Sequence, residues 1–260
     1  MPNYGDKNYW EERYDEQSGT TFDWLEDYES IKPIIDNLGI KKESRILNIG
    51  CGNSEFSEKM YEEGFTHNYN IDICQNVIDF MKERNKDKKG LHFDVMDVCE
   101  MAYKDETFDL IVDKSTIDAL LCGDHSFMIV AKMLKEVSRV LKTGGYYLII
   151  SYGQPENRMI HLERDHLAFE IQIYTIKRQE EDEQEKIHYV YICKKLPEAI
   201  ENLNNFDLVY KELEQEELEG EEGDEEQDEN NGDSNEESQK YLPTEDNENQ
   251  NQENNQNNAK

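Results

Sequence analysis

Short apolar or β-rich runs alternate with segments of helical spacing through the first 151 residues of the chain. Apolar residues recur at helical intervals between these runs, and the last helical segment ends at a Lys-Thr-Gly-Gly stretch where glycine can form a left-handed cap. Because parallel strands need a crossover that is usually a helix, this alternation predicts an α/β fold with a parallel sheet. The expected strands are residues 45–49, 68–72, 91–95, 108–113 and 146–151, and the expected helices are 54–63, 75–84 and 127–141.

Two further strand-like runs follow, over residues 168–177 and 186–194. The polar segment between them, RQEEDEQE, is too short for a crossover helix, so the two strands must pair antiparallel. We therefore predict a sheet of seven strands that ends in a C-terminal antiparallel hairpin.

The distribution of charge divides the chain into a body and a tail. The formal net charge is -32, and residues 214–260 carry 18 acidic and 2 basic side chains, or -16, which leaves -16 for the rest. The Asn/Gln-rich segment 211–260 has almost no apolar side chains to bury, so we predict a disordered acidic tail. Residues 41–210 are long enough for one domain with a sizeable core. The acidic surface of this body repels phosphate backbones, which argues against a nucleic-acid substrate.

The cysteines and the N-terminus bear on the cellular compartment. Five cysteines are widely spaced without a Cys-x-x-Cys pair, which argues against both a disulfide framework and a zinc site. The N-terminus is polar, and no run approaches the ~18 apolar residues of a membrane span. We expect a soluble cytoplasmic protein with no membrane partner and no bound metal.

The strongest chemical signal is ILNIGCGNS, in which a buried strand leads directly into Gly50, Cys51, Gly52 and the start of a helix. Glycines at such a turn let the backbone approach a ligand closely. Asp72 closes the second strand, 22 residues after Gly50, where a carboxylate can accept hydrogen bonds from both hydroxyls of a ribose. Asp97 follows the third strand and can accept a hydrogen bond from an adenine amine, or it can simply cap the segment after it. Three successive strand ends thus predict a nucleoside site.

A dinucleotide fits this site less well, because the third glycine of G-x-G-x-x-G is absent. Glu55 stands at that position, and a carboxylate at a helix N-terminus opposes a diphosphate. S-adenosylmethionine, an adenosine-type ligand without a diphosphate, is therefore the better candidate cofactor.

Four stretches carry a resemblance to a known family: YGDKNYWEERY with FDWLEDY, ILNIGCGNSEFSEKMYEEGF, FDLIVDKSTIDALLCG and LKEVSRVLKTGGYYLI. Over residues 1–210 the chain resembles the class I S-adenosylmethionine-dependent methyltransferases, within the eukaryotic methyltransferase-like group that includes the elongation factor 1-alpha lysine methyltransferases. The resemblance implies the seven-strand Rossmann-like methyltransferase sheet. It also implies cofactor contacts from Trp10, Tyr14, Trp24, Gly50, Asp72, Ile73, Asp97, Val98 and Lys114. Ser115 departs from the group, which usually has glycine after the lysine.

Two groups of these residues have alternative roles. In the aromatic-rich segment 1–40, Trp10 and Trp24 can form a cofactor lid, because aromatic faces attract a sulfonium cation by ~0.5–2 kcal/mol and exclude water. The alternative is that they only anchor the segment. At the end of the fourth strand, Asp113 and Lys114 lie where open α/β sheets place reacting groups, and a structural salt bridge is the competing explanation.

The loop after the fourth strand bears on the methyl acceptor. Amide and nucleobase-amine methyltransferases commonly have an N/D-P-P-Y/F/W loop there, whereas this chain has Asp-Lys-Ser-Thr at 113–116. The missing prolines argue against adenine, cytosine or glutamine as the acceptor. An acidic enzyme attracts a basic protein, so we expect lysine methylation of a basic protein, and the resemblance suggests translation elongation factor 1-alpha. A small-molecule methyltransferase and a non-catalytic adaptor for basic partners remain alternatives.

Several polar residues are further candidates near the acceptor. His161 and His166 follow the fifth strand, where some methyltransferases keep a base, but their hydrophilic surroundings predict surface positions. No catalytic residue is assigned. Candidates for the acceptor entrance are Glu55, Asp105, Glu106 and Asp118.

Overall fold

The computed structural model describes residues 2–164, 166–179, 185–199 and 205–215. Within these residues seven strands form one sheet in the order β3-β2-β1-β4-β5-β7-β6. β1 to β5 run parallel, and β7 pairs antiparallel with both β5 and β6, so the predicted α/β sheet and its C-terminal hairpin are confirmed. The strands are β1 (Ile46–Ile49), β2 (Asn68–Asp72), β3 (Leu91–Val95), β4 (Phe108–Lys114), β5 (Leu141–Ser151), β6 (Phe169–Gln179) and β7 (Glu185–Lys195).

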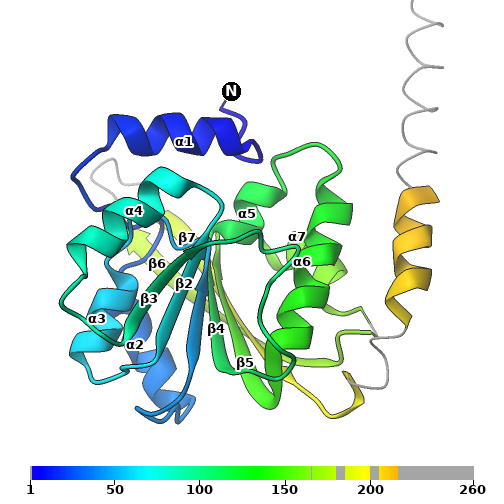
Figure 1. Cartoon of the computed structure of the whole chain (residues 1–260). Helices are drawn as coiled ribbons and strands as arrows, with labels where there is room; N and C mark the ends of the chain where they lie inside the picture. Colours follow the sequence, from blue (N-terminus) through cyan, green and yellow to red (C-terminus); the bar gives the residue numbers. More distant parts are fainter. Residues whose placement is uncertain (1, 165, 180–184, 200–204, 216–260) are drawn as a thin grey trace, which may run out of the picture. The chain divides into compact units, whose positions relative to one another are not determined.

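Helices cover both faces of the sheet, and α1 crosses above one end of it next to α4 (Figure 1). The helices α2, α3 and α4 lie on one face, and α5, α6 and α7 lie on the other. Their bounds are α1 (Lys7–Glu16), α2 (Tyr28–Asn37), α3 (Phe56–Glu62), α4 (Gln75–Arg84), α5 (Thr116–Leu120), α6 (Ser126–Val140) and α7 (Pro155–Leu162).

The alternation of side chains along the strands builds a core on each face. In β4, Ile111 packs with Val130 and Leu134 of α6, and all three are buried. Its neighbours Leu110 and Val112 pack instead with residues of α2 and α3. Successive side chains of a strand point to opposite faces, so a strand covered on both sides needs a continuous apolar run. This requirement explains the apolar run at residues 110–112 in β4.

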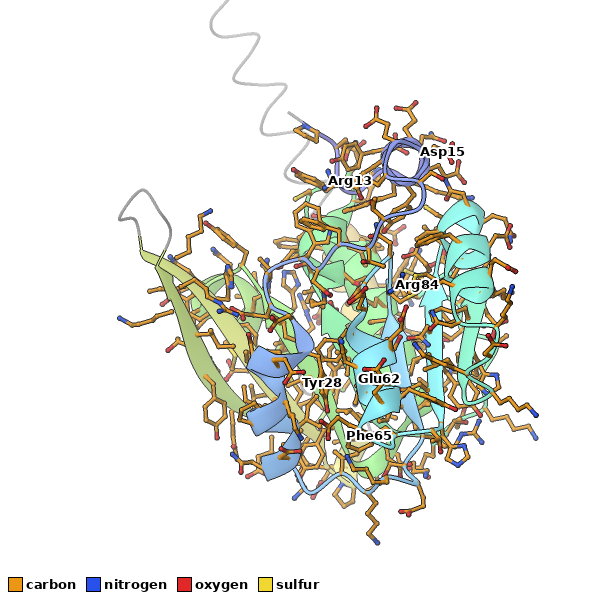
Figure 2. The ribbon with its side chains drawn as sticks, turned by 90° about the vertical axis from the view of Figure 1, so that its left-hand side faces the viewer. Arg13, Asp15, Tyr28, Glu62, Phe65 and Arg84 are labelled. Carbon is orange, nitrogen blue, oxygen red and sulfur yellow. The ribbon has the colours of Figure 1, made fainter. Side chains whose placement is uncertain are left out.

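Aspartates begin the two N-terminal helices. Asp6 accepts a hydrogen bond from the Asn8 amide at 2.8 Å at the start of α1, and Asp27 accepts one from the Ser30 amide at 3.0 Å at the start of α2. Figure 2 shows α1 at one end of the sheet and Tyr28 of α2 farther down its side. The aromatic-rich segment between these helices therefore passes over the end of the sheet.

The junction of α6 and β5 differs from the prediction. The helix ends at Val140, and the strand follows at once rather than at residue 146. The carbonyls of Arg139 and Val140 accept hydrogen bonds from the amides of Glu106 and Thr107, so the segment before β4 satisfies the last helical turn. Tertiary hydrogen bonds thus replace the glycine cap, and the Lys-Thr-Gly-Gly stretch joins the strand.

A helical segment follows the hairpin at residues 206–215. Its side chains Phe206 and Leu213 are buried against α6. The predicted start of the tail at residue 211 therefore falls inside a packed helix, because these two apolar residues, seven apart, share one helical face. The rest of the predicted disordered tail, residues 216–260, lies outside the described residues. Of the helices that the structure describes, none has the length and apolar character needed to cross a membrane.

Candidate functional site

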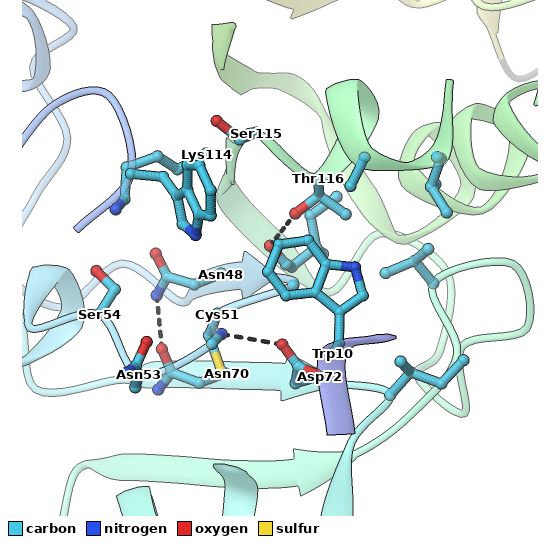
Figure 3. A pocket seen from close by; sticks show the side chains of 18 of the residues that line it. Trp10, Asn48, Cys51, Asn53, Ser54, Asn70, Asp72, Lys114, Ser115 and Thr116 are labelled. Carbon is cyan, nitrogen blue, oxygen red and sulfur yellow. Dashed lines mark hydrogen bonds between the residues drawn. The ribbon is translucent and has the colours of Figure 1, made fainter. Parts of the chain in front are cut away.

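A cavity of about 170 Å³ lies at the carboxyl ends of the parallel strands, below the N-terminal segment (Figure 3). Its walls come from segments that are far apart in the sequence: the N-terminal segment, the loop after β1, the ends of β2 and β4, and the residues after β3. All nine residues with predicted cofactor contacts line it, namely Trp10, Tyr14, Trp24, Gly50, Asp72, Ile73, Asp97, Val98 and Lys114. The fold therefore gathers the predicted set into one site.

The glycines of the loop after β1 have conformations that other residues rarely adopt. Gly50 and Gly52 have φ angles of 55° and 50°. A Cβ on Gly50 would lie 2.2 Å from Thr116 Oγ1, and one on Gly52 would lie 2.8 Å from Tyr14 Oη. The sequence analysis attributed these glycines to the close approach of a ligand. The structure adds that neighbouring protein groups already fill the space that their side chains would need.

Asp72 holds the glycine loop at the end of β2. Its Oδ2 accepts a hydrogen bond from the Gly52 amide at 2.9 Å, and its Oδ1 accepts one from the Cys74 amide at 3.0 Å. Burial raises the pKa of Asp72 above its usual range, although these two amides oppose the shift. Because a carboxylate oxygen has two lone pairs, each oxygen can still accept a second hydrogen bond, as a ribose requires.

Two asparagines that the sequence analysis overlooked form part of the cavity wall. Asn48 Nδ2 donates to Asn70 Oδ1 at 3.0 Å, as Figure 3 shows, and Asn70 Nδ2 donates to the carbonyl of His92. Both asparagines are buried and line the cavity. The available signal was an asparagine in the otherwise apolar β1 and another at the aligned position of β2, since buried amides require hydrogen-bond partners.

The residues after β2 and β3 offer both apolar and polar surface. Ile73 keeps 39% of its surface exposed at the cavity, and the largely buried Val98 lines it as well. Asp97 Oδ1 accepts a hydrogen bond from the Cys99 amide at 2.8 Å, which is the capping role that the sequence left open. The side chain is exposed at the cavity, so capping with one oxygen leaves the other able to meet a ligand.

The two tryptophans are both anchored and exposed to the cavity. Trp10 Nε1 donates to the carbonyl of Tyr4 at 2.7 Å, and its ring stacks on Tyr14. Trp24 meets Trp10 edge to face, with ring centroids 6.0 Å apart, and carries the Arg13 guanidinium 4.8 Å from its centroid. These contacts fix the rings in place, while both still line the cavity. The anchoring and lid roles are therefore compatible.

Asp113 and Lys114 do not form a salt bridge with each other. Asp113 is buried and accepts hydrogen bonds from Tyr147 Oη at 2.7 Å and from the Thr116 amide at 2.8 Å. Burial raises the pKa of Asp113 to about 7. Lys114 points to the opposite face and pairs with Asp23 at 2.7 Å. Burial lowers the pKa of Lys114, and Asp23 opposes this shift. Neighbouring strand residues face opposite ways, which rules out the direct pair.

Ser115 has a left-handed backbone with φ of 67°, which explains why glycine suits this position in the group that the chain resembles. Its hydroxyl is buried at the cavity without a hydrogen-bond partner in the described structure. An unpaired buried hydroxyl in a cavity is a polar group that a bound ligand can satisfy.

The four acidic candidates for the acceptor entrance all have structural partners. Glu55 accepts hydrogen bonds from Thr21 and Arg84, and Asp118 from Ser151 and Arg158. Asp105 and Glu106 precede β4, whose other end lines the cavity, so they lie about 20 Å away at ~3.3 Å per strand residue. The entrance role predicted for these last two residues is wrong.

The two histidines are also placed differently from the prediction. His161 and His166 are 2% and 1% exposed, whereas the sequence predicted surface positions. Burial lowers the pKa of His161 to about 4, and its ring packs edge to face on Phe127. Neither residue lines the cavity. For His161 the surrounding charges are misleading because α7 buries one face and exposes the other.

The donor set of the cavity fits an adenosine-type sulfonium cofactor. It combines a buried carboxylate with free lone pairs, an apolar pair, aromatic rings, an unpaired hydroxyl and two lysines, Lys7 and Lys114. Among the described residues, no group of three or more His, Cys, Asp and Glu side chains is placed to hold a metal ion.

Comparisons with known proteins identify the family of the chain. The profile of the methyltransferase domain family matches residues 40–192. The mouse eEF1A lysine and N-terminal methyltransferase is 39% identical over 154 residues, which covers 58% of this chain and 22% of that protein. The mouse EEF1A lysine methyltransferase 4 is 29% identical over 167 residues, which covers 61% of this chain and 65% of that protein. The chain thus matches about a fifth of the length of the first of these relatives.

Solved structures share the fold. An S-adenosylmethionine-dependent methyltransferase from Methanosarcina mazei has a TM-score of 0.51 at 20% identity and covers 67% of this chain and 99% of its own. The Haemonchus contortus phosphoethanolamine N-methyltransferase 2, solved with S-adenosylhomocysteine, has a TM-score of 0.55 at 16% identity and covers 70% of this chain and 56% of its own. Since the family profile spans more than half of the sequence, the chain belongs to the methyltransferase domain family and has the fold of S-adenosylmethionine-dependent methyltransferases.

Proposed function

We propose that this chain is an S-adenosylmethionine-dependent protein-lysine methyltransferase that acts on translation elongation factor 1-alpha in the cytoplasm. The observation that carries the proposal is the single cavity that unites the glycine loop, Asp72 and Lys114 in a chain of the methyltransferase domain family. The names of the two relatives, which specify lysine methylation of eEF1A, support the choice of acceptor.

Each part of the cofactor has a candidate partner in the cavity. The Asp72 carboxylate would accept hydrogen bonds from the ribose hydroxyls. Ile73 and Val98 offer apolar contact to the adenine ring, with Asp97 available for its amine. The positive charge of Lys114 suits the carboxylate of the amino-acid moiety.

When bound, S-adenosylmethionine supplies a methyl group that its sulfonium makes electrophilic. Trp10 and Trp24 present aromatic rings to the cavity, which favour a positive charge and exclude water. An in-line displacement depends chiefly on alignment, so the protein's main task is to hold the acceptor amine in line and let its proton reach solvent.

The surroundings of the cavity favour an amine on a basic protein as the acceptor. Asp113 is committed to Tyr147 and to backbone amides, so it is not available to bind an amide or a nucleobase amine. The body and residues 214–260 each carry a net charge of -16, which attracts a cationic partner and speeds encounter.

The decisive experiment incubates the purified chain with unmethylated recombinant elongation factor 1-alpha and S-adenosylmethionine labelled on its methyl group. Mass spectrometry should locate the label on a lysine, and an elongation factor with that lysine replaced by arginine is the matched control. A label on the N-terminal α-amine would instead assign the second activity named for the relatives.

Two other results would replace the proposal. A labelled metabolite from a cytosolic extract, with no labelled protein, would indicate a small-molecule methyltransferase. Cofactor binding without any transfer would indicate a non-catalytic adaptor.

A further inference from the structure

Asp23 connects the N-terminal segment to two residues that line the cavity. Its Oδ1 accepts hydrogen bonds from Lys114 Nζ at 2.7 Å and from the hydroxyl of Ser54. Lys114 lines the cavity at the end of β4, and Ser54 lines it in the loop after β1. The Asp23 side chain is 24% exposed, compared with 9% for Lys114. Asp23 is not itself a lining residue, but its partly exposed carboxylate bonds two residues that line the cavity.

The second oxygen of Asp23 is able to accept further hydrogen bonds. Among the described residues, none donates a hydrogen bond to Asp23 Oδ2. Its sequence neighbours Phe22 and Trp24 both line the cavity, with ring centroids 5.3 Å apart, and Phe22 is 42% exposed. A carboxylate that is flanked in the sequence by two aromatic residues of the cavity wall suits an alkylammonium group, which gains from both charge and cation-π attraction.

The other carboxylates near the cavity are occupied or lie elsewhere. Glu55 forms an ion pair with Arg84 at 2.6 Å and accepts a hydrogen bond from Thr21, both through Oε1, and it does not line the cavity. Asp97 follows β3, which is three strand spacings of ~4.8 Å from β4 in the sheet, so it belongs to the far end of the cavity. Asp72 is the proposed partner of the ribose, and donors already bind both oxygens of Asp113, Asp118 and Glu26.

The geometry points to Asp23 as the residue that binds the amine of the methyl acceptor, in a subsite walled by Phe22 and Trp24. The inference rests on the proposed function, because it concerns the acceptor half of the same site. It also limits the acceptor to an aliphatic amine, since an amide or a hydroxyl gains little from a carboxylate beside aromatic rings.

The subsite also has a part in proton release. An ammonium nitrogen has no lone pair, so one N–H bond must break and its proton must pass to water before the nitrogen can accept a methyl group. Asp23 Oδ2 accepts a hydrogen bond from a remaining N–H and keeps the neutral amine in position. The Asp23 carboxylate itself favours the ammonium form, and Lys114 on its other oxygen offsets part of this preference, because a nearby positive charge lowers the pKa of an amine.

The competing role for Asp23 is that of a clamp that only fastens the N-terminal segment to Lys114 and Ser54. The two roles differ in the ligands that they affect. Loss of a clamp loosens the cover of the cavity and weakens every ligand. Loss of an amine-binding oxygen weakens only a ligand that carries an amine.

The test is calorimetric titration of the full chain with three probes. The first is S-adenosylhomocysteine. The second is its analogue in which nitrogen replaces sulfur and carries a 3-aminopropyl arm, and the third is the matching analogue with a 3-hydroxypropyl arm. Each probe is titrated into the parent protein, into Asp23→Asn, and into Asp27→Asn, a control that removes the same charge from the same segment and keeps a residue able to cap α2.

We expect the parent protein to bind the analogue with the amine arm about tenfold more tightly than the analogue with the hydroxyl arm. A tenfold ratio is at the lower end of the range for a hydrogen bond to a charged group. Asp23→Asn should abolish this difference and leave the affinity for S-adenosylhomocysteine within about twofold. Asp27→Asn should preserve the difference. Retained binding of S-adenosylhomocysteine also shows that the variant is folded.

Three results would overturn the inference. If the parent protein binds both analogues with equal affinity, there is no amine subsite at Asp23. The proposed function would not be affected by that result. If Asp23→Asn weakens the binding of all three probes equally, Asp23 is only a clamp for the N-terminal segment. If S-adenosylhomocysteine fails to bind the parent, the cofactor assignment falls, and the proposed function and this inference fall with it.

Discussion

Thr116 occupies the space that a side chain on Gly50 would need. A Cβ on Gly50 would lie 2.2 Å from Thr116 Oγ1, and this hydroxyl donates a hydrogen bond to the carbonyl of Ile49 at 2.9 Å. The end of β1 and the start of α5 therefore meet without room for a methyl group. Because Gly50 also has a positive φ, both packing and backbone conformation require glycine here.

We expect Gly50→Ala to lower the free energy of unfolding by about 1–3 kcal/mol through backbone strain and the clash with Thr116. Urea denaturation measures the loss. The variant Thr116→Ala supplies the second arm of a double-mutant cycle, because it removes the nearest clashing atoms. The Gly50→Ala penalty should shrink in that background, and an unchanged penalty would mean that packing against Thr116 is not its cause.

Asp72→Ala should weaken binding of S-adenosylmethionine by about 1.5–3 kcal/mol, because the ribose would lose a charge-assisted acceptor. It should also reduce stability, since the amides of Gly52 and Cys74 would lose their acceptor. Calorimetry and urea denaturation separate the two effects. A folded variant that binds the cofactor as tightly as the parent would show that Asp72 does not contact the ribose.

Asp113 should make stability depend on pH between about 4 and 7. Its pKa is about 7 in the folded protein against an ordinary value of 3.8, so the folded state keeps a proton that the unfolded state loses. Stability therefore falls as the pH rises through this window, with a slope of at most about 1.4 kcal/mol per unit from this residue, and levels off above it. Denaturation of Asp113→Asn across the same range should lack this component, and parallel curves for variant and parent would refute the assignment.

Deletion of residues 216–260 should change encounter with a basic substrate and leave the chemistry unaltered. The segment carries 17 acidic and 2 basic side chains. We expect an unchanged kcat and cofactor affinity, with a lower kcat/KM at low salt that converges with the parent at ~1 M salt, where the Debye length is ~3 Å. A chain of the same length with Asn and Gln in place of Asp and Glu is the control. Equal kcat/KM values at low salt would leave the segment only a solubilising role.

A single sequence is enough to predict the order of the elements and nine of the residues that line the cavity. The period of the apolar residues separates strands from helices, and a glycine loop after the first buried strand marks where a ligand approaches. Residues such as Asp72 and Asp97 follow from this, because the carboxyl ends of parallel strands always meet at one edge of the sheet. These signals are local and repeat at fixed intervals, so a single sequence carries them.

Only the tertiary structure decided which charged side chains are free at the cavity. Lys114 pairs with Asp23, 91 residues earlier, rather than with its neighbour Asp113, and Asp118 is committed to Arg158. The burial of His161 contradicted its hydrophilic surroundings in the same way. The partner of an ion pair is chosen by proximity between strand ends and loops, and the cost of burying an unpaired charge enforces that choice. A local sequence pattern shows neither which side chains come close together nor what it costs to bury a charge. The acceptor half of the site therefore became visible only in the folded chain.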